Sequence, residues 1–261
     1  KFTEKAFNDD EHSETKLTEA VQSISNQADL LKMYREVIIM NNEGKYEEAL
    51  KLNKELIKLD PQNAMYHNSL GCTYSNLKHF DDAIAEYKTA IGLDPNNAES
   101  HYNLATALYE MKCYDEAIAE YKTAIDLDPN DADLHNNFAN TLSDLKRYDE
   151  AIAEYKIAIA LDPNDSIYHN NLAVALFAIK NFIAAITEYK IAIKLNPIVS
   201  GYHYNLANAL YETKCYDDAI AEYNAALNLE PNNKVYQEKL KTVINKKALS
   251  EENEDKNLQL V

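Results

Sequence analysis

The sequence contains little glycine, no paired set of cysteines and no long apolar run. Four glycines in 261 residues are few for a protein with many turns or strands. Because glycine costs a helix about 1 kcal/mol relative to alanine, their scarcity favours helices. No apolar segment approaches the roughly 20 residues that span a bilayer, so membrane insertion is not expected. The cysteines Cys72, Cys113 and Cys215 form no CxxC pair, which is typical of free thiols in a reducing compartment.

Short motifs of catalysis and cofactor binding are also missing. The sequence has no nucleophile elbow, glycine-rich phosphate loop, HExxH or zinc-type cysteine pair, so we predict no enzymatic activity, no cofactor and no metal. The net charge is −17, from 43 acidic and 26 basic residues. Because such a chain repels phosphate backbones and anionic membranes, nucleic acid is not an expected partner.

Proline is rare but strictly periodic, with each of the six prolines 34 residues from the next. A period of this length indicates an array of one supersecondary unit. The prolines are Pro61, Pro95, Pro129, Pro163, Pro197 and Pro231. They divide the chain into units 30–63, 64–97, 98–131, 132–165, 166–199 and 200–233.

Each unit has the pattern of two antiparallel helices. In the third unit, Leu104 and Leu108 share one face of a first helix, and Ala117 and Tyr121 share one face of a second helix. Asp115 precedes the second apolar pattern and is expected to cap that helix.

The unit resembles a tetratricopeptide repeat, and the resemblance covers about 204 of the 261 residues. It implies an all-α fold, a right-handed α-solenoid (superhelix) of six helix-turn-helix repeats with capping helices. In the third unit the family pattern reads His101, Leu104-Ala105, Leu108, Ala117, Tyr121, Ala124 and Pro129.

The ends of the array depart from this pattern. We expect residues 1–29 to form a polar segment and a lead-in helix, 234–249 a capping helix, and 250–261 a disordered acidic tail. In the first repeat Asn53 stands where the family has an aromatic residue, which suits an end unit with a half-exposed face.

Five histidines also recur every 34 residues. A shared metal is not expected, because zinc needs ligand nitrogens about 2.0–2.1 Å away, and equivalent points on packed helices lie about 8–10 Å apart. We interpret these histidines as packing residues in the place of the family's large aromatic side chain. They are His67, His101, His135, His169 and His203.

Asparagine occupies one groove position of four consecutive first helices: Asn103, Asn137, Asn171 and Asn205. An asparagine amide offers both a donor and an acceptor. The series is similar to the asparagine ladder of the O-linked N-acetylglucosamine transferases, which implies that it holds a peptide backbone. Asn140 and Asn208, one helical turn further on, would widen it. Alternatively, these asparagines were copied with the repeat and contact only water or neighbouring helices.

The fifth repeat replaces polar groove residues with Ile167, Val174 and Phe177. This apolar patch is a candidate pocket for a partner's side chain. Alternatively, another copy of the chain or its C-terminal segment covers the patch. The aromatic residues expected to read side chains beside the ladder are Tyr102, Tyr109, Tyr204 and Tyr211.

We therefore predict a non-enzymatic scaffold that binds an extended, neutral or basic peptide in a concave groove. Carboxylates at groove positions favour a basic ligand. The alternatives are a self-assembling structural protein, hence a homo-oligomer, or the targeting module of a larger glycosyltransferase-like enzyme. These groove carboxylates are Glu99, Glu110, Asp133, Asp144 and Glu212.

The chain begins with Lys1, so we expect a fragment or a processed product. We expect a cytoplasmic location. The richness in Asn, Lys, Ile and Tyr indicates an AT-rich genome, and the alternative location is a host cell, into which an intracellular bacterium secretes the protein as an effector.

Overall fold

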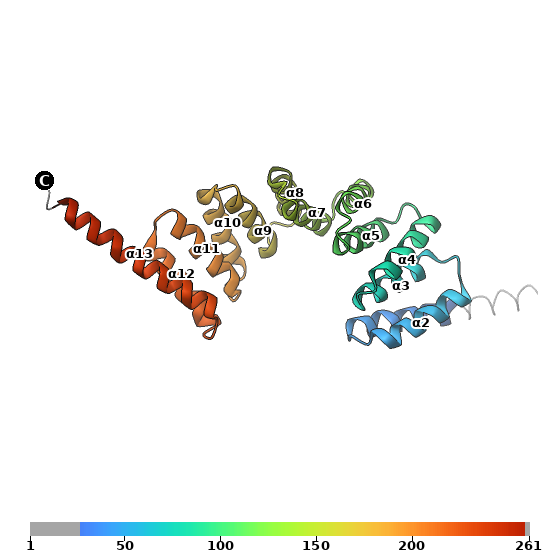
Figure 1. Cartoon of the computed structure of the whole chain (residues 1–261). Coiled ribbons are helices and arrows are strands. Elements are labelled where there is room, and N and C mark those ends of the chain that lie inside the picture. The colour runs from blue at the N-terminus through green and yellow to red at the C-terminus, as the bar shows by residue number, and fades with distance from the viewer. Residues whose placement is uncertain (1–26, 259–261) are drawn as a thin grey trace, which may run out of the picture. The chain divides into compact units, whose positions relative to one another are not determined.

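The computed structural model describes residues 27–258, and all regular secondary structure within that range is helical (Figure 1). This confirms the predicted all-α class. The predicted lead-in helix lies largely outside the described residues, although a helix is present over residues 27–42. No helix of the described range is both long and apolar enough to cross a membrane.

The described residues form two compact units, one up to Leu127 and one from Asp128 onward. In the first unit the helix 27–42 is followed by α2 (Tyr46–Leu59), α3 (Ala64–Asn76), α4 (Phe80–Leu93), α5 (Ala98–Glu110) and α6 (Tyr114–Leu127). The second unit consists of α7 (Ala132–Asp144), α8 (Tyr148–Leu161), α9 (Ser166–Ala178), α10 (Phe182–Leu195), α11 (Ser200–Glu212), α12 (Tyr216–Leu229) and α13 (Lys234–Leu258). Within each unit every helix packs against the next. Each unit is therefore an α-solenoid of helix pairs, as the period predicts.

One alanine and one tyrosine of each second helix form the centre of the helix pair. The alanine is fully buried in α4, α6, α8, α10 and α12, which lets the paired helices approach closely. The tyrosine four residues later is 1–2 % exposed. These tyrosines are Tyr87, Tyr121, Tyr155, Tyr189 and Tyr223.

The turn inside each repeat has a left-handed residue, and in five repeats this residue is lysine. Lys78, Lys112, Lys146, Lys180 and Lys214 have φ between 60° and 63°, where glycine is the usual choice. The first repeat has Gly44 at this place, with φ 75°. The turn closes by backbone hydrogen bonds; for example, the Lys146 N–H donates to the Ser143 carbonyl at 2.9 Å.

Helix starts differ from the prediction. The second helices α4, α8 and α12 have no side-chain cap hydrogen bond, because their acids lie inside the first turn rather than before it. Asp115 likewise lies in the first turn of α6, where a carboxylate interacts with the helix dipole. Side-chain caps are found on the first helices α3, α5, α7 and α9; for example, Asp131 Oδ1 accepts from the Asp133 N–H at 2.9 Å. The second helix α10 also has one, because Asn181 Oδ1 accepts from the Ala184 N–H at 3.4 Å.

Helix α13 continues to Leu258, beyond the predicted capping helix 234–249 and into the tail that was expected to be disordered. Lys247 explains part of this continuation. Its Nζ lies 2.5 Å from Asp217 Oδ1 on α12 and 3.5 Å from Glu251 Oε1, one turn further along α13. Such an i,i+4 pair supports the helix at the point where the tail begins.

Asn53 is fully buried, so the expectation of a half-exposed face at this residue is wrong. Its Nδ2 donates to Thr73 Oγ1 at 2.9 Å and to the Ser69 carbonyl at 3.4 Å, both on the following helix. The amide oxygen is buried without a hydrogen-bond partner. In the other repeats the buried tyrosine of the second helix, here called the wedge tyrosine, fills this place. In the first repeat a polar contact between α2 and α3 replaces it.

Gly71 provides a test of this close packing. A Cβ added to Gly71 would lie 2.5 Å from the ring of Tyr87, whereas one added to Gly92 would meet no atom within 4 Å. We therefore expect Gly71→Ala to lower the free energy of unfolding by about 1–3 kcal/mol through overpacking. Gly92→Ala should raise it by about 0.5–1 kcal/mol, because alanine loses less backbone entropy. Circular dichroism during urea denaturation measures both changes, and equal stability of the two variants would contradict the tight contact.

Candidate functional site

The predicted ladder asparagines lie at one position of four successive first helices, Asn103 on α5, Asn137 on α7, Asn171 on α9 and Asn205 on α11. All four side chains are half-buried. They are therefore neither core residues nor free surface residues.

The ladder amides are hydrogen-bonded to the preceding repeat. Asn103 Nδ2 donates to Asn68 Oδ1 at 3.1 Å, and Asn205 Nδ2 donates to Asn170 Oδ1 at the same distance. Within the described residues, the amide oxygens of Asn103 and Asn205 accept no hydrogen bond. Asn103 Nδ2 also donates to Cys72 Sγ at 3.4 Å, so both of its N–H groups are used, whereas Asn205 Nδ2 makes one such bond. The amide oxygens of both residues stay available to a ligand.

Asn171 is bonded more completely. Its Nδ2 donates to Asn136 Oδ1 at 3.1 Å and to Asn140 Oδ1 at 3.3 Å, both on α7. Its own oxygen accepts from Asn170 Nδ2 at 3.3 Å. The ladder positions therefore differ in what they have left for a ligand.

The second row of asparagines has a partner in the core. In three of the four ladder repeats, the residue three positions after the ladder asparagine is hydrogen-bonded to the buried tyrosine of the same repeat. The pairs are Thr106 with Tyr121 at 3.2 Å, Asn140 with Tyr155 at 2.6 Å and Asn208 with Tyr223 at 2.6 Å. Asn140 and Asn208 therefore link the tyrosine wedge to the groove surface, a role that sequence spacing did not reveal.

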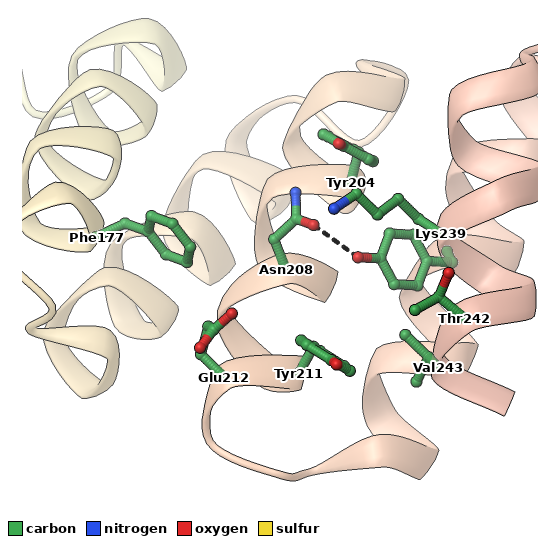
Figure 2. A pocket seen from close by; sticks show the side chains of 9 residues that line it. Phe177, Tyr204, Asn208, Tyr211, Glu212, Lys239, Thr242 and Val243 are labelled. Carbon is green, nitrogen blue, oxygen red and sulfur yellow. Dashed lines mark hydrogen bonds between the residues drawn. The ribbon is translucent and has the colours of Figure 1, made fainter. Parts of the chain in front are cut away.

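Four of the predicted residues meet around one cavity of about 330 Å³ (Figure 2). Phe177 comes from α9, and Tyr204, Asn208 and Tyr211 come from α11. The cavity is also lined by Glu212 and by Tyr223, whose pKa is raised chiefly by burial. This is a largely aromatic recess with a carboxylate beside it.

Helix α13 supplies the other wall of the cavity through Lys239, Thr242 and Val243 (Figure 2). Sequence analysis missed these residues because it assigned α13 only a capping role. The 34-residue period continues into this helix, since Lys239 and Thr242 stand 34 residues after Asn205 and Asn208. Helix α13 therefore occupies the place of another first helix. An ammonium group therefore joins the site.

The aromatic side chains of α11 are held in place by their neighbours. The Tyr204 ring stacks on Tyr236 of α13, with centroids 4.7 Å apart, and lies edge-on to Tyr223 at 5.9 Å. Tyr211 contacts Tyr216 at 5.9 Å. This packing limits the freedom that a ligand would otherwise have to remove.

The third repeat has the corresponding aromatic residues in the first unit. The Tyr102 ring is 6.1 Å from Tyr121, and the Tyr109 ring is 5.8 Å from Tyr114. Both Tyr102 and Tyr109 are half-buried. The similarity follows from the sequence, because residues 101–129 and 203–231 match at 21 of 29 positions.

The apolar residues of the fifth repeat are on the surface of α9. Ile167 is 52 % and Val174 is 42 % exposed, and Phe177 is half-buried against Phe182, with ring centroids 5.2 Å apart. Their spacing of seven and three residues places them on one face of the helix.

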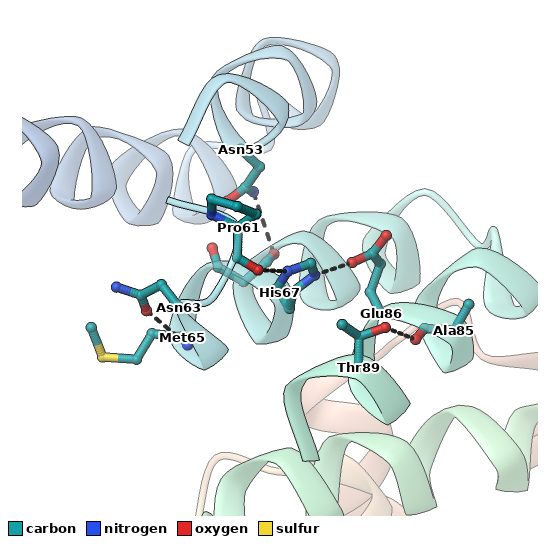
Figure 3. Close-up of polar contacts among 9 residues, drawn as sticks. Asn53, Pro61, Asn63, Met65, His67, Ala85, Glu86 and Thr89 are labelled. Carbon is teal, nitrogen blue, oxygen red and sulfur yellow. Dashed lines mark hydrogen bonds and ion pairs between the residues drawn. The ribbon is translucent and has the colours of Figure 1, made fainter. Parts of the chain in front are cut away.

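The repeated histidines have polar partners that the packing interpretation did not include. His67 Nδ1 lies 2.7 Å from Glu86 Oε2, and Nε2 lies 3.1 Å from the Pro61 carbonyl oxygen (Figure 3). Because a carbonyl oxygen only accepts, Nε2 must carry a proton. The same arrangement recurs at His101, His135, His169 and His203.

The signal for this clamp was a glutamate 19 residues after each histidine, which recurs with the same period. The clamp ties the inter-repeat turn to both helices of a repeat. In α13, Gln237 takes the histidine's place and donates from Nε2 to the Pro231 carbonyl at 2.9 Å. No group of side chains suited to a metal ion is found among the described residues.

Substitution of His101 tests the clamp. His101→Ala leaves the Pro95 carbonyl and Glu120 without their partner and should lower the free energy of unfolding by about 1–3 kcal/mol. His101→Gln restores a donor to the carbonyl, as Gln237 does, and should recover part of this loss. Chemical denaturation compares the two variants, and equal destabilisation would show that the carbonyl bond contributes nothing.

Comparisons with known proteins agree with this architecture. Three tetratricopeptide repeat profiles match residues 68–132, 112–175 and 200–233, together more than half of the chain. The chain belongs to the tetratricopeptide repeat family. Its repeats form a protein-interaction scaffold.

Among solved structures, PilF of Pseudomonas aeruginosa is similar with a TM-score of 0.70 and 20 % identity, over 80 % of this chain and 95 % of that chain. YrrB, a TPR protein with an unusual peptide-binding site, has a TM-score of 0.62 and 17 % identity, over 72 % and 97 %. MamA of Desulfovibrio magneticus RS-1 has a TM-score of 0.61 and 19 % identity, over 65 % and 96 %. These similarities show the fold. A comparison with curated protein sequences gives no match.

Proposed function

We propose that the protein is a non-enzymatic scaffold that binds an extended peptide segment along its first helices. The observation that carries this proposal is the cavity of about 330 Å³. It brings Phe177, Tyr204, Asn208 and Tyr211 together within one unit. A recess of this size, with aromatic walls and polar groups between them, is typical of sites that accept a ligand's side chain.

The ladder supports binding of the peptide backbone. The available oxygens of Asn103 and Asn205 accept hydrogen bonds, so they would receive the N–H groups of an extended ligand. At Asn103 this use differs from a full amide pair, because its nitrogen already donates to Asn68 and Cys72. YrrB, of the same fold, is a peptide-binding TPR protein.

Charge favours a neutral or basic ligand. The chain carries a net charge of −17, and Glu212 lines the cavity. Lys239 on the opposite helix also lines it, so the site offers a partner both for a basic side chain and for a backbone carbonyl. A peptide with a lysine or arginine near an apolar residue fits these contacts best.

The test uses a library of fluorescein-labelled nonapeptides built from Ser, Lys, Leu and Phe. Replacing Asn103, Asn137, Asn171 and Asn205 together with Ala should weaken binding of the tightest member at least about tenfold, because several backbone contacts are lost. Helicity should not change. Fluorescence anisotropy and circular dichroism measure the two properties.

Asn136→Ala is the matched control. It removes the hydrogen bond that Asn136 accepts from Asn171 but leaves the four ladder residues in place. It should lower stability without changing peptide affinity. An affinity that is unchanged in the fourfold variant would refute the ladder, and failure of every library member to bind would refute the peptide scaffold.

A second candidate function is association with another copy of the chain. Ile183 is 71 % and Ile198 is 76 % exposed, where the neighbouring repeats have aspartate and asparagine. The fifth repeat contains three lysines and one glutamate, in a chain that is otherwise acidic. Such a surface complements the acidic repeats of a second copy.

Light scattering at several protein concentrations tests association. We expect the average mass to rise with concentration in the unmodified chain. The double variant Ile183→Asp, Ile198→Asn restores the residues of the other repeats and should stay monomeric. A monomeric mass of the unmodified chain throughout the range would exclude this function.

A further inference from the structure

The fifth repeat contains the one wedge tyrosine of α6, α8, α10 and α12 whose hydroxyl has lost its partner. Tyr121, Tyr155 and Tyr223 are bonded to polar side chains of their own first helices. The corresponding residue in the fifth repeat is Val174, and in the described part of the chain the Tyr189 hydroxyl makes no hydrogen bond. Tyr189 is only 2 % exposed.

The tip of this hydroxyl keeps contact with solvent, because within the described residues Asn53 Oδ1 is the one fully buried polar side-chain atom that lacks a partner. The O–H is therefore open to an acceptor from outside the chain. Three sister repeats show where the hydroxyl is directed. In each of them it reaches the residue that corresponds to Val174, and in the sixth repeat both Tyr223 and its partner Asn208 line the cavity. The Tyr189 hydroxyl is therefore directed to the groove side of α9.

The same substitution frees a second donor. Asn171 donates to residues at two positions of the preceding first helix, Asn136 and Asn140. Asn205 donates only to Asn170, because Val174 stands at the second of these positions and offers no acceptor. One valine thus leaves both a phenol O–H and an amide N–H of the second unit without an acceptor.

The surroundings define what an acceptor must be. Val174 is 42 % exposed, and Phe177 and Ile167 lie on the same face of α9, so a ligand must bring apolar surface as well. Glu212 on α11 and the net charge of −17 oppose a carboxylate. A backbone carbonyl next to an apolar side chain satisfies all of these conditions.

We propose that Tyr189 and Asn205 bind one backbone carbonyl of the peptide, whose neighbouring apolar side chain packs on Val174 and Phe177. This subsite rests on the proposed peptide-binding function and specifies it: the ligand needs an apolar residue at the fifth repeat. The groove then binds peptide N–H groups at ladder oxygens and one C=O group here.

Stability measurements test the free hydroxyl without any ligand. Val174→Asn gives Tyr189 the partner that Tyr155 and Tyr223 have, and should raise the melting temperature by about 2–4 °C. Tyr189→Phe removes no hydrogen bond and should not lower the melting temperature, whereas Tyr223→Phe breaks the bond to Asn208 and should lower it. An equal loss in both Phe variants would overturn the subsite.

Binding is measured with the tightest nonapeptide of the library. Val174→Asn and Tyr189→Phe should each weaken it about tenfold, and Val174→Ile, which keeps both donors free, should bind as the unmodified chain does. In a thioamide scan of the peptide, one weakened carbonyl should lower affinity for the unmodified chain but not for Val174→Asn. This pattern would locate the carbonyl.

The outcomes separate the two proposals. If the peptide binds Val174→Asn and Tyr189→Phe as tightly as the unmodified chain, the subsite is wrong and the peptide scaffold stands. If no peptide binds the unmodified chain, both proposals fail.

Discussion

The structure depends on a tyrosine that is buried between the two helices of a repeat and that, in the third, fourth and sixth repeats, is hydrogen-bonded through its hydroxyl to the first helix. The ring fills the space beside a fully buried alanine, and the hydroxyl reaches the first helix next to the groove. Core packing and groove chemistry are therefore coupled through one residue. A substitution at the position of Asn140 or Asn208 changes whether the tyrosine hydroxyl has a hydrogen-bond partner. A substitution of the tyrosine in turn leaves the groove residue without its partner.

The second repeated device, the histidine clamp, acts on the turns between repeats. Each histidine joins the carbonyl of the periodic proline to a glutamate on the second helix. The proline ends one repeat, and the histidine anchors that end to the next. In an array where each repeat contacts only its neighbours, such contacts set how firmly adjacent repeats hold together.

The period allowed the helix pairs, the class of fold and the positions of the ladder to be predicted. It gave positions but not the direction of side-chain groups. Asn103 and Asn205 lie at equivalent positions of their first helices, as the period implies, but the period did not reveal that their amide nitrogens donate to the preceding repeat. A comparison of equivalent positions in successive repeats does not reveal contacts between different positions of one repeat. The pair of His101 and Glu120 was missed for this reason. Asn53 was interpreted from its place in an end repeat, which does not reveal a buried hydrogen bond.

The five lysines in left-handed turns set a limit on how short the array can be. A non-glycine residue in this conformation costs about 1–2 kcal/mol, so the five turns together cost about as much as the whole stability of a small domain. A solenoid tolerates this cost because each added repeat brings a new interface with its neighbour. A piece with few repeats still has one strained turn in each repeat. It has fewer interfaces per repeat, because its two end repeats each lack a neighbour. The length of the array is thus part of what keeps each repeat folded.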